Sequence, residues 1–448
     1  MRHKKFSLIL AVLFLFTISG NVFAQTNISK EPPKIYGSAA ITMDAQTGEI
    51  IYAKDIDGKQ YKQLNNTKGM YPASVTKLMT ALLFAENKDK KGLNVLNYTK
   101  SAKEQPKYSL NTDYPNINFN IGKPLSVNDV MNALLLYSAN DIAYTIAGNI
   151  GKTDSYDENS KQAVDNFRKM MNDKAAELKM KNTHFITANG LHDDNHYTTP
   201  YDLTLLARAA LKNKWVAKTM NTKKGVLKID GKTIPIENRN KLLGENINGA
   251  VCIGGKTGYT SKSGRCLVAI FEKDGRKVIG VVMHSIYDAK DSFVFQDMKK
   301  IIDWSFNVKP VNYMNKNTTI KTATLKYKPF KFFGPEKTLK VPLILKENIT
   351  YYNNSINKKE FKTKIDTSNL TFKNLSSEKP VSKLIVSERE AVKSYDLYTN
   401  VSKSQIFKDN ILLYVGLIVG LIVIIILIMF IVSLIKNGRR RKRNRYWR

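Results

Sequence analysis

A serine and a lysine lie three residues apart in the segment Ser74-Val-Thr-Lys77, directly before an apolar run from Leu78 to Ala85. The run has the spacing of a buried helix, and one helical turn places the lysine amine beside the serine hydroxyl. Such a hydroxyl becomes a useful nucleophile when a neighbouring base takes its proton. A lysine can be that base if burial, the helix dipole or a second cation lowers its pKa. The segment therefore predicts a nucleophilic Ser74 activated by a neutral Lys77.

The Ser-x-x-Lys spacing alone is weak evidence, because it recurs at three other places in the chain. Ser355 and Ser376 begin the same pattern in polar segments without a helix signal, which favours solvated loops. Ser433 begins it at the border of a long apolar run. Ser74 differs because it begins a buried helix and has two further segments downstream that can complete a site.

The second segment is Ser138-Ala-Asn140, which falls at a break between two predicted helices. Such a break can point a hydroxyl and an amide into a cleft. The hydroxyl can relay a proton between Lys77 and a leaving group, and the amide can hold both a lysine and a substrate amide. The pattern also occurs at Ser109 and Ser305, so its value depends on the other segments.

The third segment, Gly254 to Thr260, contains Lys256-Thr257-Gly258 and is predicted to end a strand. Glycines there let a ligand approach the backbone, and an edge strand can pair with an extended peptide. Lys256 and Thr257 can bind a carboxylate, and Lys256 is the second cation expected to lower the pKa of Lys77. The alternative for this segment alone is a solvated lysine in a glycine-rich turn.

The sequence pattern between residues 33 and 305 predicts the helices and strands that position these three segments. It begins with a hairpin and ends with three strands and a helix, and helices dominate between them. We expect strands distant in sequence to close one antiparallel sheet flanked by helices. Residues 98–124 are polar and are expected to form an exposed excursion. The expected strands are 39–43, 50–53, 249–258, 265–272 and 277–284, and the expected helices begin near 74, 126, 141, 164, 199 and 292.

The ends of the chain predict a membrane topology. Residues 1–24 are typical of a secretory signal peptide, with an uncleaved membrane helix as the alternative. Residues 308–404 show short alternating runs that predict a small β-rich stalk. Residues 411–435 carry no charge and are long enough to cross about 30 Å of hydrocarbon. The basic tail 436–448 is then cytoplasmic by the positive-inside rule, which makes the protein a single-pass protein of the cell membrane with its main domain outside.

The net charge of +33 fits nucleic acid, an anionic membrane or a wall polymer as a partner. The predicted topology excludes nucleic acid, because residues 25–410 lie outside the cell. Cys252 and Cys266 are the only cysteines and could pair there. The predicted hairpin between them does not place them opposite each other, so we expect two buried thiols.

Together the three segments resemble the Ser-x-x-Lys, Ser-x-Asn and Lys-Thr-Gly set of penicillin-binding proteins and serine β-lactamases, in the same order. Further stretches look like the low-molecular-mass D-alanyl-D-alanine carboxypeptidases: 134–141, 189–191 with 197–203, and 238–240. The resemblance covers about 33–305 and implies a β-lactamase/transpeptidase-like domain, mixed α/β. It also implies a serine-type carboxypeptidase that removes the terminal D-Ala from peptidoglycan stem peptides, is acylated by β-lactam antibiotics and needs no cofactor.

By that resemblance Ser74 is the acylated nucleophile and Lys77 the general base, and Ser138 assists proton transfer. The backbone N–H groups of Ser74 and Tyr259 would form the oxyanion hole. Arg239 matches an arginine near the site of the family. The substrate-binding residues that the resemblance implies are Asn140, Arg239, Lys256, Thr257, Gly258 and Tyr259.

Three other interpretations remain open at this point. Class A β-lactamases deacylate through a Glu-x-x-Leu-Asn glutamate, and none of the glutamates between the second and third segments fits that pattern. A non-catalytic β-lactam sensor or wall-binding receptor would need a cytoplasmic effector, for which the tail after Ile435 is short. The cluster His192-Asp-Asp-Asn-His196 suggests a metal, but it lacks the glutamate of His-Glu-x-x-His and lies in a polar loop.

Overall fold

The computed structural model describes residues 31–59, 69–330 and 333–445. The chain divides into two compact units that meet between Lys309 and Pro310, with residues 47–49 counted in the second. The predicted signal peptide, residues 1–24, lies outside the described residues.

A six-stranded antiparallel sheet forms the centre of the first unit, with strand order β2-β1-β10-β9-β8-β7. Strand β1 (Ala39–Asp44) pairs along its whole length with β10 (Arg276–Ser285), although more than 230 residues separate them. The sequence prediction that distant strands close one sheet is therefore confirmed. The other strands are β2 (Ile50–Lys54), β7 (Asn246–Ile247), β8 (Ala250–Thr260) and β9 (Gly264–Lys273).

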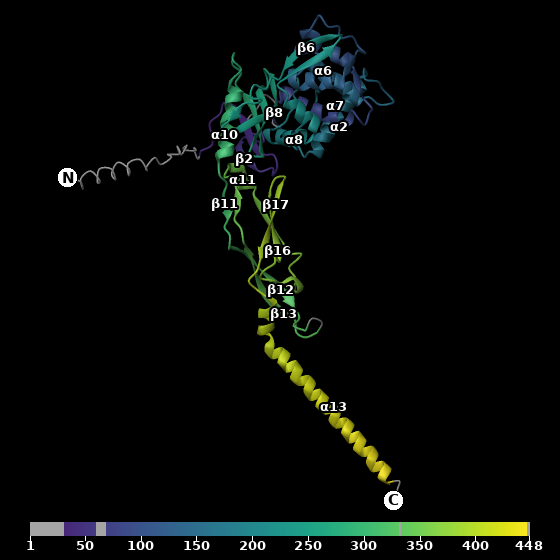
Figure 1. The fold of residues 1–448 in the computed structure, drawn as a ribbon, viewed down its shortest axis with the longest axis vertical. Helices are drawn as coiled ribbons and strands as arrows, with labels where there is room; N and C mark the ends of the chain where they lie inside the picture. The colour runs from purple at the N-terminus through teal and green to yellow at the C-terminus, as the bar shows by residue number, and fades with distance from the viewer. Residues whose placement is uncertain (1–30, 60–68, 331–332, 446–448) are drawn as a thin grey trace, which may run out of the picture. The chain divides into compact units, whose positions relative to one another are not determined.

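Helices cover both faces of this sheet (Figure 1). Helix α10 (Phe293–Asn307) packs on β9 and β10, while α8 (Pro200–Lys212) packs on β10 and β1. Residues 278–283 of β10 are consequently all buried, which explains why this strand is a continuous apolar run. The remaining elements of the unit are the 3₁₀ turn Ala73–Thr76, α2 (Lys77–Asn87), β3 (Val95–Asn97), α3 (Lys100–Lys103), α4 (Leu110–Asp113), β4 (Pro124–Ser126), α5 (Val127–Asn132), the π turn Ala133–Tyr137, α6 (Asn140–Gly151), α7 (Lys161–Glu177), α9 (Lys214–Met220), β5 (Lys224–Ile229) and β6 (Lys232–Glu237).

Two local expectations need correction. Residues 98–124 are not a simple exposed excursion, because they contain α3 and α4 and bury the rings of Tyr98 and Phe119 completely. The hydroxyl of Tyr98 is bonded to the carboxylate of Asp141 at 3.0 Å, so this polar stretch packs on α6 through contacts that local polarity does not reveal. The Lys256-Thr257-Gly258 segment lies inside β8 rather than at its end, since β8 continues to Thr260.

The second unit contains the predicted small β module. Its main sheet has five strands in the order β12-β13-β17-β16-β15, and its core is formed by alternating residues such as Val341, Leu343 and Leu345. The elements are β11 (Val311–Met314), β12 (Thr319–Tyr327), β13 (Lys337–Leu345), β14 (Ile349–Tyr351), α11 (Ser355–Glu360), β15 (Lys362–Asp366), a 3₁₀ turn Phe372–Asn374, β16 (Ser382–Glu388), β17 (Ala391–Tyr398), α12 (Lys403–Asp409) and α13 (Ile411–Arg445).

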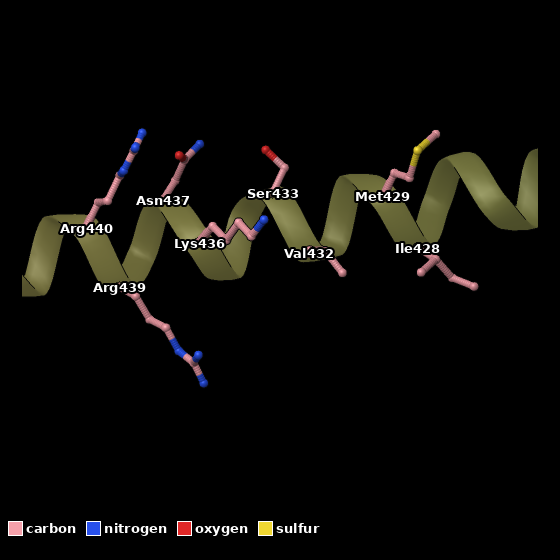
Figure 2. Close-up of a pocket in the computed structure, with 8 residues that line it drawn as sticks. All are labelled: Ile428, Met429, Val432, Ser433, Lys436, Asn437, Arg439 and Arg440. Atoms are coloured by element: carbon pink, nitrogen blue, oxygen red, sulfur yellow. The ribbon is translucent and has the colours of Figure 1, made fainter.

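Helix α13 is the one helix of the described chain that is long and apolar enough to cross a membrane, over Ile411–Arg440. Its apolar side chains are exposed to the surroundings rather than packed in a core. Figure 2 shows the C-terminal part of this helix, where Ile428, Met429 and Val432 are followed by basic side chains such as Lys436 and Arg440. Composition changes from apolar to strongly basic within three helical turns, as expected where a span leaves the hydrocarbon.

Candidate active site

The predicted nucleophile lies on a tight turn in front of a buried helix. Ser74 belongs to the 3₁₀ turn Ala73–Thr76, which leads directly into α2. Ala73 has a φ of +50°, which is unfavourable for a residue with a Cβ atom. The first eight residues of α2 are all buried, so the helix cannot rotate without opening the core. This packing holds Ser74 at the mouth of a cleft.

The amine of Lys77 makes three polar contacts. Its Nζ atom lies 2.9 Å from Ser74 Oγ, 2.8 Å from Asn140 Oδ1 and 2.8 Å from the carbonyl oxygen of Asn189. The side-chain nitrogen of Asn140 donates to the carbonyl oxygen of Lys107, so the side-chain oxygen of Asn140 is the atom that faces Lys77 as an acceptor. A neutral amine has two N–H donors for these two oxygens. Its lone pair then faces Ser74, which is the geometry of a general base.

Burial is the main cause that lowers the pKa of Lys77 well below its usual range. Arg239 lowers the pKa further through its positive charge, whereas the carboxylate of Asp141 raises it. From the sequence we expected Lys256 to be the cation that lowers the pKa of Lys77, whereas in the structure this cation is Arg239. Burial also lowers the pKa of Lys256, and the charge of Lys77 adds to this effect. The two lysines are therefore electrostatically coupled in one buried site.

Ser138 links the second buried lysine to the cleft. Lys256 Nζ donates to Ser138 Oγ at 2.8 Å and to the carbonyl of Thr257 at 3.0 Å. Ser138 ends the π turn with a φ of +72°, in the left-handed region. Asn140 follows as the first residue of α6 and contacts Lys77. The strained turn thus places the Ser138 side chain against Lys256 and the Asn140 side chain against Lys77.

Strand β8 approaches the nucleophile through a glycine. A Cβ atom on Gly258 would lie 3.0 Å from the backbone nitrogen of Ser74 and 2.9 Å from the carbonyl oxygen of Pro72. Only glycine allows this contact without a shift of the backbone. The close approach brings the backbone of Gly258 next to the N–H of Ser74, and the following residue, Tyr259, is the expected second donor for an oxyanion.

These residues surround a single cleft of about 230 Å³ in the first unit. Lys77 and Lys256 are almost completely buried, and they contact the lining residues Ser74 and Ser138, respectively. The cleft brings together the other sequence-predicted site residues, together with several that the sequence analysis did not select. The lining residues are Ser74, Tyr108, Ser138, Asn140, Leu191, Arg239, Thr257, Gly258, Tyr259, Arg265 and Tyr287.

Asn189 and Gly190 form a part of the site that sequence reasoning did not assign. The carbonyl of Asn189 accepts from Lys77, and Gly190 has a φ of +83° with space for no side chain, because a Cβ atom would lie 1.9 Å from the carbonyl oxygen of Ala73. Thr80 of α2 also donates to the carbonyl of Ala188 at 2.6 Å. The Asn-Gly pair was a visible turn signal, but its contact with α2 depends on the fold.

His196 is hydrogen-bonded to the turn that leads into α2. Its Nδ1 atom accepts from the backbone N–H groups of Ile186 and Thr187, each at 3.1 Å, so its Nε2–H donates to Thr76 Oγ1 at 2.9 Å. Burial lowers the pKa of His196 to about 3, which keeps the ring neutral. His192 instead contacts Asp194. Within the described ranges, no group of three or more His, Cys, Asp or Glu side chains has the arrangement of a metal site.

Two arginines at the cleft are held by aromatic rings. The guanidinium of Arg239 lies 5.2 Å from the ring centre of Tyr108 and 4.9 Å from that of Tyr137. Arg265 lies over Tyr259 and Tyr287 and forms a two-pronged ion pair with Asp291. Stacking and pairing of this kind fix a planar cation at the entrance of the cleft. Arg265 was not selected from the sequence because no motif marks it.

The site contains a serine hydroxyl in hydrogen-bond contact with a buried lysine, and a second serine–lysine pair lies across the cleft. Both pairs lie beside an antiparallel sheet whose nearest strand approaches through a glycine. These features define a serine peptidase of the penicillin-binding class. The chain belongs to the D-alanyl-D-alanine carboxypeptidase family called Peptidase_S11, whose profile matches residues 26–286. It is thus a serine-type carboxypeptidase, a hydrolase.

Named relatives agree with this assignment. D-alanyl-D-alanine carboxypeptidase DacF of Bacillus subtilis is 25% identical over 365 residues, which are 80% of this chain and 84% of the relative. Penicillin-Binding Protein D2 of Listeria monocytogenes in its cefotaxime-bound form is 28% identical with a TM-score of 0.50, and the Streptomyces K15 DD-transpeptidase is 26% identical with a TM-score of 0.51. Each covers 62% of this chain and all of the solved one. The transpeptidase-like fold predicted from the sequence is confirmed.

Proposed function

We propose that this protein is a membrane-anchored D,D-carboxypeptidase that removes the terminal D-Ala from peptidoglycan stem peptides through an acyl-enzyme on Ser74. The contact of Lys77 with Ser74, Asn140 and the Asn189 carbonyl supports this proposal most strongly, because it leaves the lysine one lone pair and aims it at the hydroxyl. Relatives in the family carry the name of this activity.

In the first step, Lys77 takes the proton of Ser74 Oγ while the oxygen attacks the carbonyl carbon of the penultimate D-Ala. The carbonyl oxygen becomes negative and is stabilised by the backbone N–H groups of Ser74 and Tyr259. The C–N bond then breaks, and the departing D-Ala nitrogen needs one proton. Ser138, whose Oγ atom accepts from Lys256 Nζ at 2.8 Å, can give its hydroxyl proton and regain the proton that Lys77 took from Ser74, so that Lys77 is neutral again. The product is an ester on Ser74 and free D-Ala.

In the second step, water replaces D-Ala at the carbonyl carbon. The neutral Lys77 takes a proton from the water and passes it to Ser74 Oγ as the ester bond breaks, which restores the free serine and the neutral lysine. Thr257 and Lys256 are the proposed partners of the substrate carboxylate, with Arg239 and Arg265 as further cations beside the cleft. An incoming amine in place of water would give transpeptidation, so both products should be measured.

Intact-mass analysis with a penicillin tests the acyl-enzyme directly. The parent should gain one penicillin mass, Ser74→Ala should gain none, and the matched variants Ser355→Ala and Ser376→Ala should be labelled like the parent. A D-Ala release assay with a stem pentapeptide should follow the same order. Rapid loss of the adduct with hydrolysed penicillin would favour a β-lactamase, and labelling without D-Ala release would favour a sensor.

The proposed topology places the first unit and the β module outside the cell and the tail from Lys436 inside. The apolar-to-basic change along α13 supports this orientation. A protease added to protoplasts should remove the penicillin-labelled unit and leave a tag at the C-terminus intact. Digestion of the tag from outside would reverse the orientation.

A further inference from the structure

Four aromatic side chains gather where helix α13 begins, and we call them the aromatic collar: Phe330, Phe333, Phe407 and Tyr414. The ring centres of Phe330 and Phe333 are 5.0 Å apart, Phe330 meets Tyr414 at 5.6 Å, and Phe407 stacks on Tyr414 at 4.9 Å. The Tyr414 hydroxyl donates to the carbonyl of Pro329 at 3.2 Å. The described residues of the β12–β13 loop therefore meet α12 and α13 in one cluster.

The collar is fastened to the sheet by the buried side chain of Asn410. Lys337 donates to Asn410 Oδ1 at 2.7 Å, and Asn410 Nδ2 donates to the Tyr327 hydroxyl at 2.9 Å and to the carbonyl of Ile406. Ile406 in turn lies in the hydrophobic core of the β module. The first turn of α13 is thus held against the end of the β12–β13 hairpin.

The collar is not buried despite these contacts. Phe333 is 57% exposed and Phe407 is 54% exposed, next to the apolar side chains of Ile411 and Leu412. Exposed aromatic rings that continue an exposed apolar helix mark a surface that meets an apolar or interfacial medium. The surface is continuous with the predicted membrane span.

Helix geometry gives the depth of the collar. The uncharged stretch 411–435 is about 37 Å long at 1.5 Å per residue, whereas the hydrocarbon layer is about 30 Å thick. If the first basic residue, Lys436, marks the inner border, about 20 residues reach the outer border near Gly416. Tyr414 then lies at the level of the lipid headgroups, where tyrosine and other amphipathic side chains are stable.

We propose that the aromatic collar inserts into the headgroup layer of the outer leaflet and binds the β module to the membrane surface, in addition to the span itself. Lys328, Lys403 and Lys408 are exposed and lie within four positions of a collar residue in the chain, and their charges complement lipid phosphates. The inference rests on the span of α13 that is part of the proposed function. The proposal gives the β module a contact with lipid, whereas its sequence alone predicted a stalk.

Site-specific quenching tests the collar in the full chain. Both native cysteines are buried, so a single cysteine can be labelled with a fluorophore in Phe333→Cys. Glu347→Cys is the matched control, because Glu347 is exposed just beyond the opposite end of β13, a strand of nine residues that is about 30 Å long. Both proteins are reconstituted in vesicles of two parts phosphatidylcholine to one part phosphatidylglycerol, with a quencher attached near the lipid headgroup.

The label at Phe333→Cys should be quenched at least twofold more strongly than the label at Glu347→Cys, and both proteins should react with penicillin like the parent. Equal quenching at the two positions would overturn the proposal. A label at Phe333→Cys that is shielded from a water-soluble quencher but not quenched by lipid would show a contact with protein, such as a second copy, and would also overturn it. Alkaline flotation of both variants tests the membrane span separately. A protein that floats but shows equal quenching contradicts the collar proposal alone, whereas a protein that does not float contradicts the span.

Discussion

The amine of Lys256 lies 2.8 Å from the hydroxyl of Ser138, although 118 positions separate the two residues in the chain. Ser138 makes this contact from a left-handed backbone conformation with a φ of +72°, which costs energy for any residue with a Cβ atom. The contact is therefore maintained against local preference, as is common at sites selected for activity rather than stability.

This strain can be measured by comparing two variants that both lack the Ser138 hydroxyl. Ser138→Gly should be more stable than Ser138→Ala by roughly 1 kcal/mol, because glycine adopts positive φ freely. Denaturant unfolding of the two variants gives the difference. Equal stability would show that the turn relaxes when the hydroxyl is removed. Both variants should acylate about 10²–10³-fold more slowly than the parent if Ser138 relays the proton.

Lys77→Arg should slow acylation by penicillin by about 10³-fold or more, because arginine keeps its proton at any working pH and cannot act as a base. Stopped-flow or quenched mass measurements give the rate. Lys358→Arg is the control, since Lys358 follows Ser355 with the same spacing in the second unit. A parent-like rate for Lys77→Arg would remove the lysine from the mechanism.

The pH profile of acylation should respond to Arg239. Acylation requires neutral Lys77, so the rate rises with pH through the pKa of that lysine. The charge of Arg239 lowers this pKa, and Arg239→Gln should therefore raise it and move the acidic limb to higher pH. Arg239→Lys retains the charge and should leave the limb near its parent position.

Lys256→Ala should move the acidic limb in the same direction if its protonated form is the coupled partner of Lys77. It should also weaken recognition of the substrate carboxylate. A limb that stays in place in a folded Lys256→Ala protein would show that Arg239 and burial suffice to keep Lys77 neutral.

His196 predicts a loss of stability in acid. Its pKa is about 3 in the folded protein and 6.5 in an ordinary environment, so the unfolded chain binds the proton more readily between these values. The free energy of unfolding should fall as the pH drops from 6.5 towards 3, by up to about 4–5 kcal/mol from this residue. Thermal unfolding at several pH values measures the effect, and His196→Gln should flatten it. An unchanged slope in that variant would contradict the assignment.

The two cysteines should behave as protected thiols. Both are buried and unpaired, and burial raises the pKa of each thiol to about 11. Native protein should therefore react with a thiol reagent at least about tenfold more slowly than unfolded protein, in which two thiols per chain should be counted. Fewer than two thiols in unfolded, unreduced protein would indicate a disulfide.

Much of the chemistry was determined by the sequence itself. The Ser74–Lys77 pair depends only on one turn of helix, Ser138 and Asn140 depend on a local break between helices, and Lys256 to Tyr259 depend on a strand pattern. The helix that starts at Thr199 and Pro200 and the two thiols that do not pair were also predictable, because capping, proline position and strand register act over short distances. Each of these features is local in the chain.

Tertiary structure decided the protonation of the site and the residues that support it. The pKa of Lys77 is lowered by its burial and by the charge of Arg239, and the amine is positioned by the Asn189 carbonyl, 112 positions away. His196 was a metal candidate in the sequence and is a buried support of Thr76 in the fold. Such roles follow from desolvation and from contacts between distant segments, and neither residue type nor spacing encodes them because both arise only when the core closes.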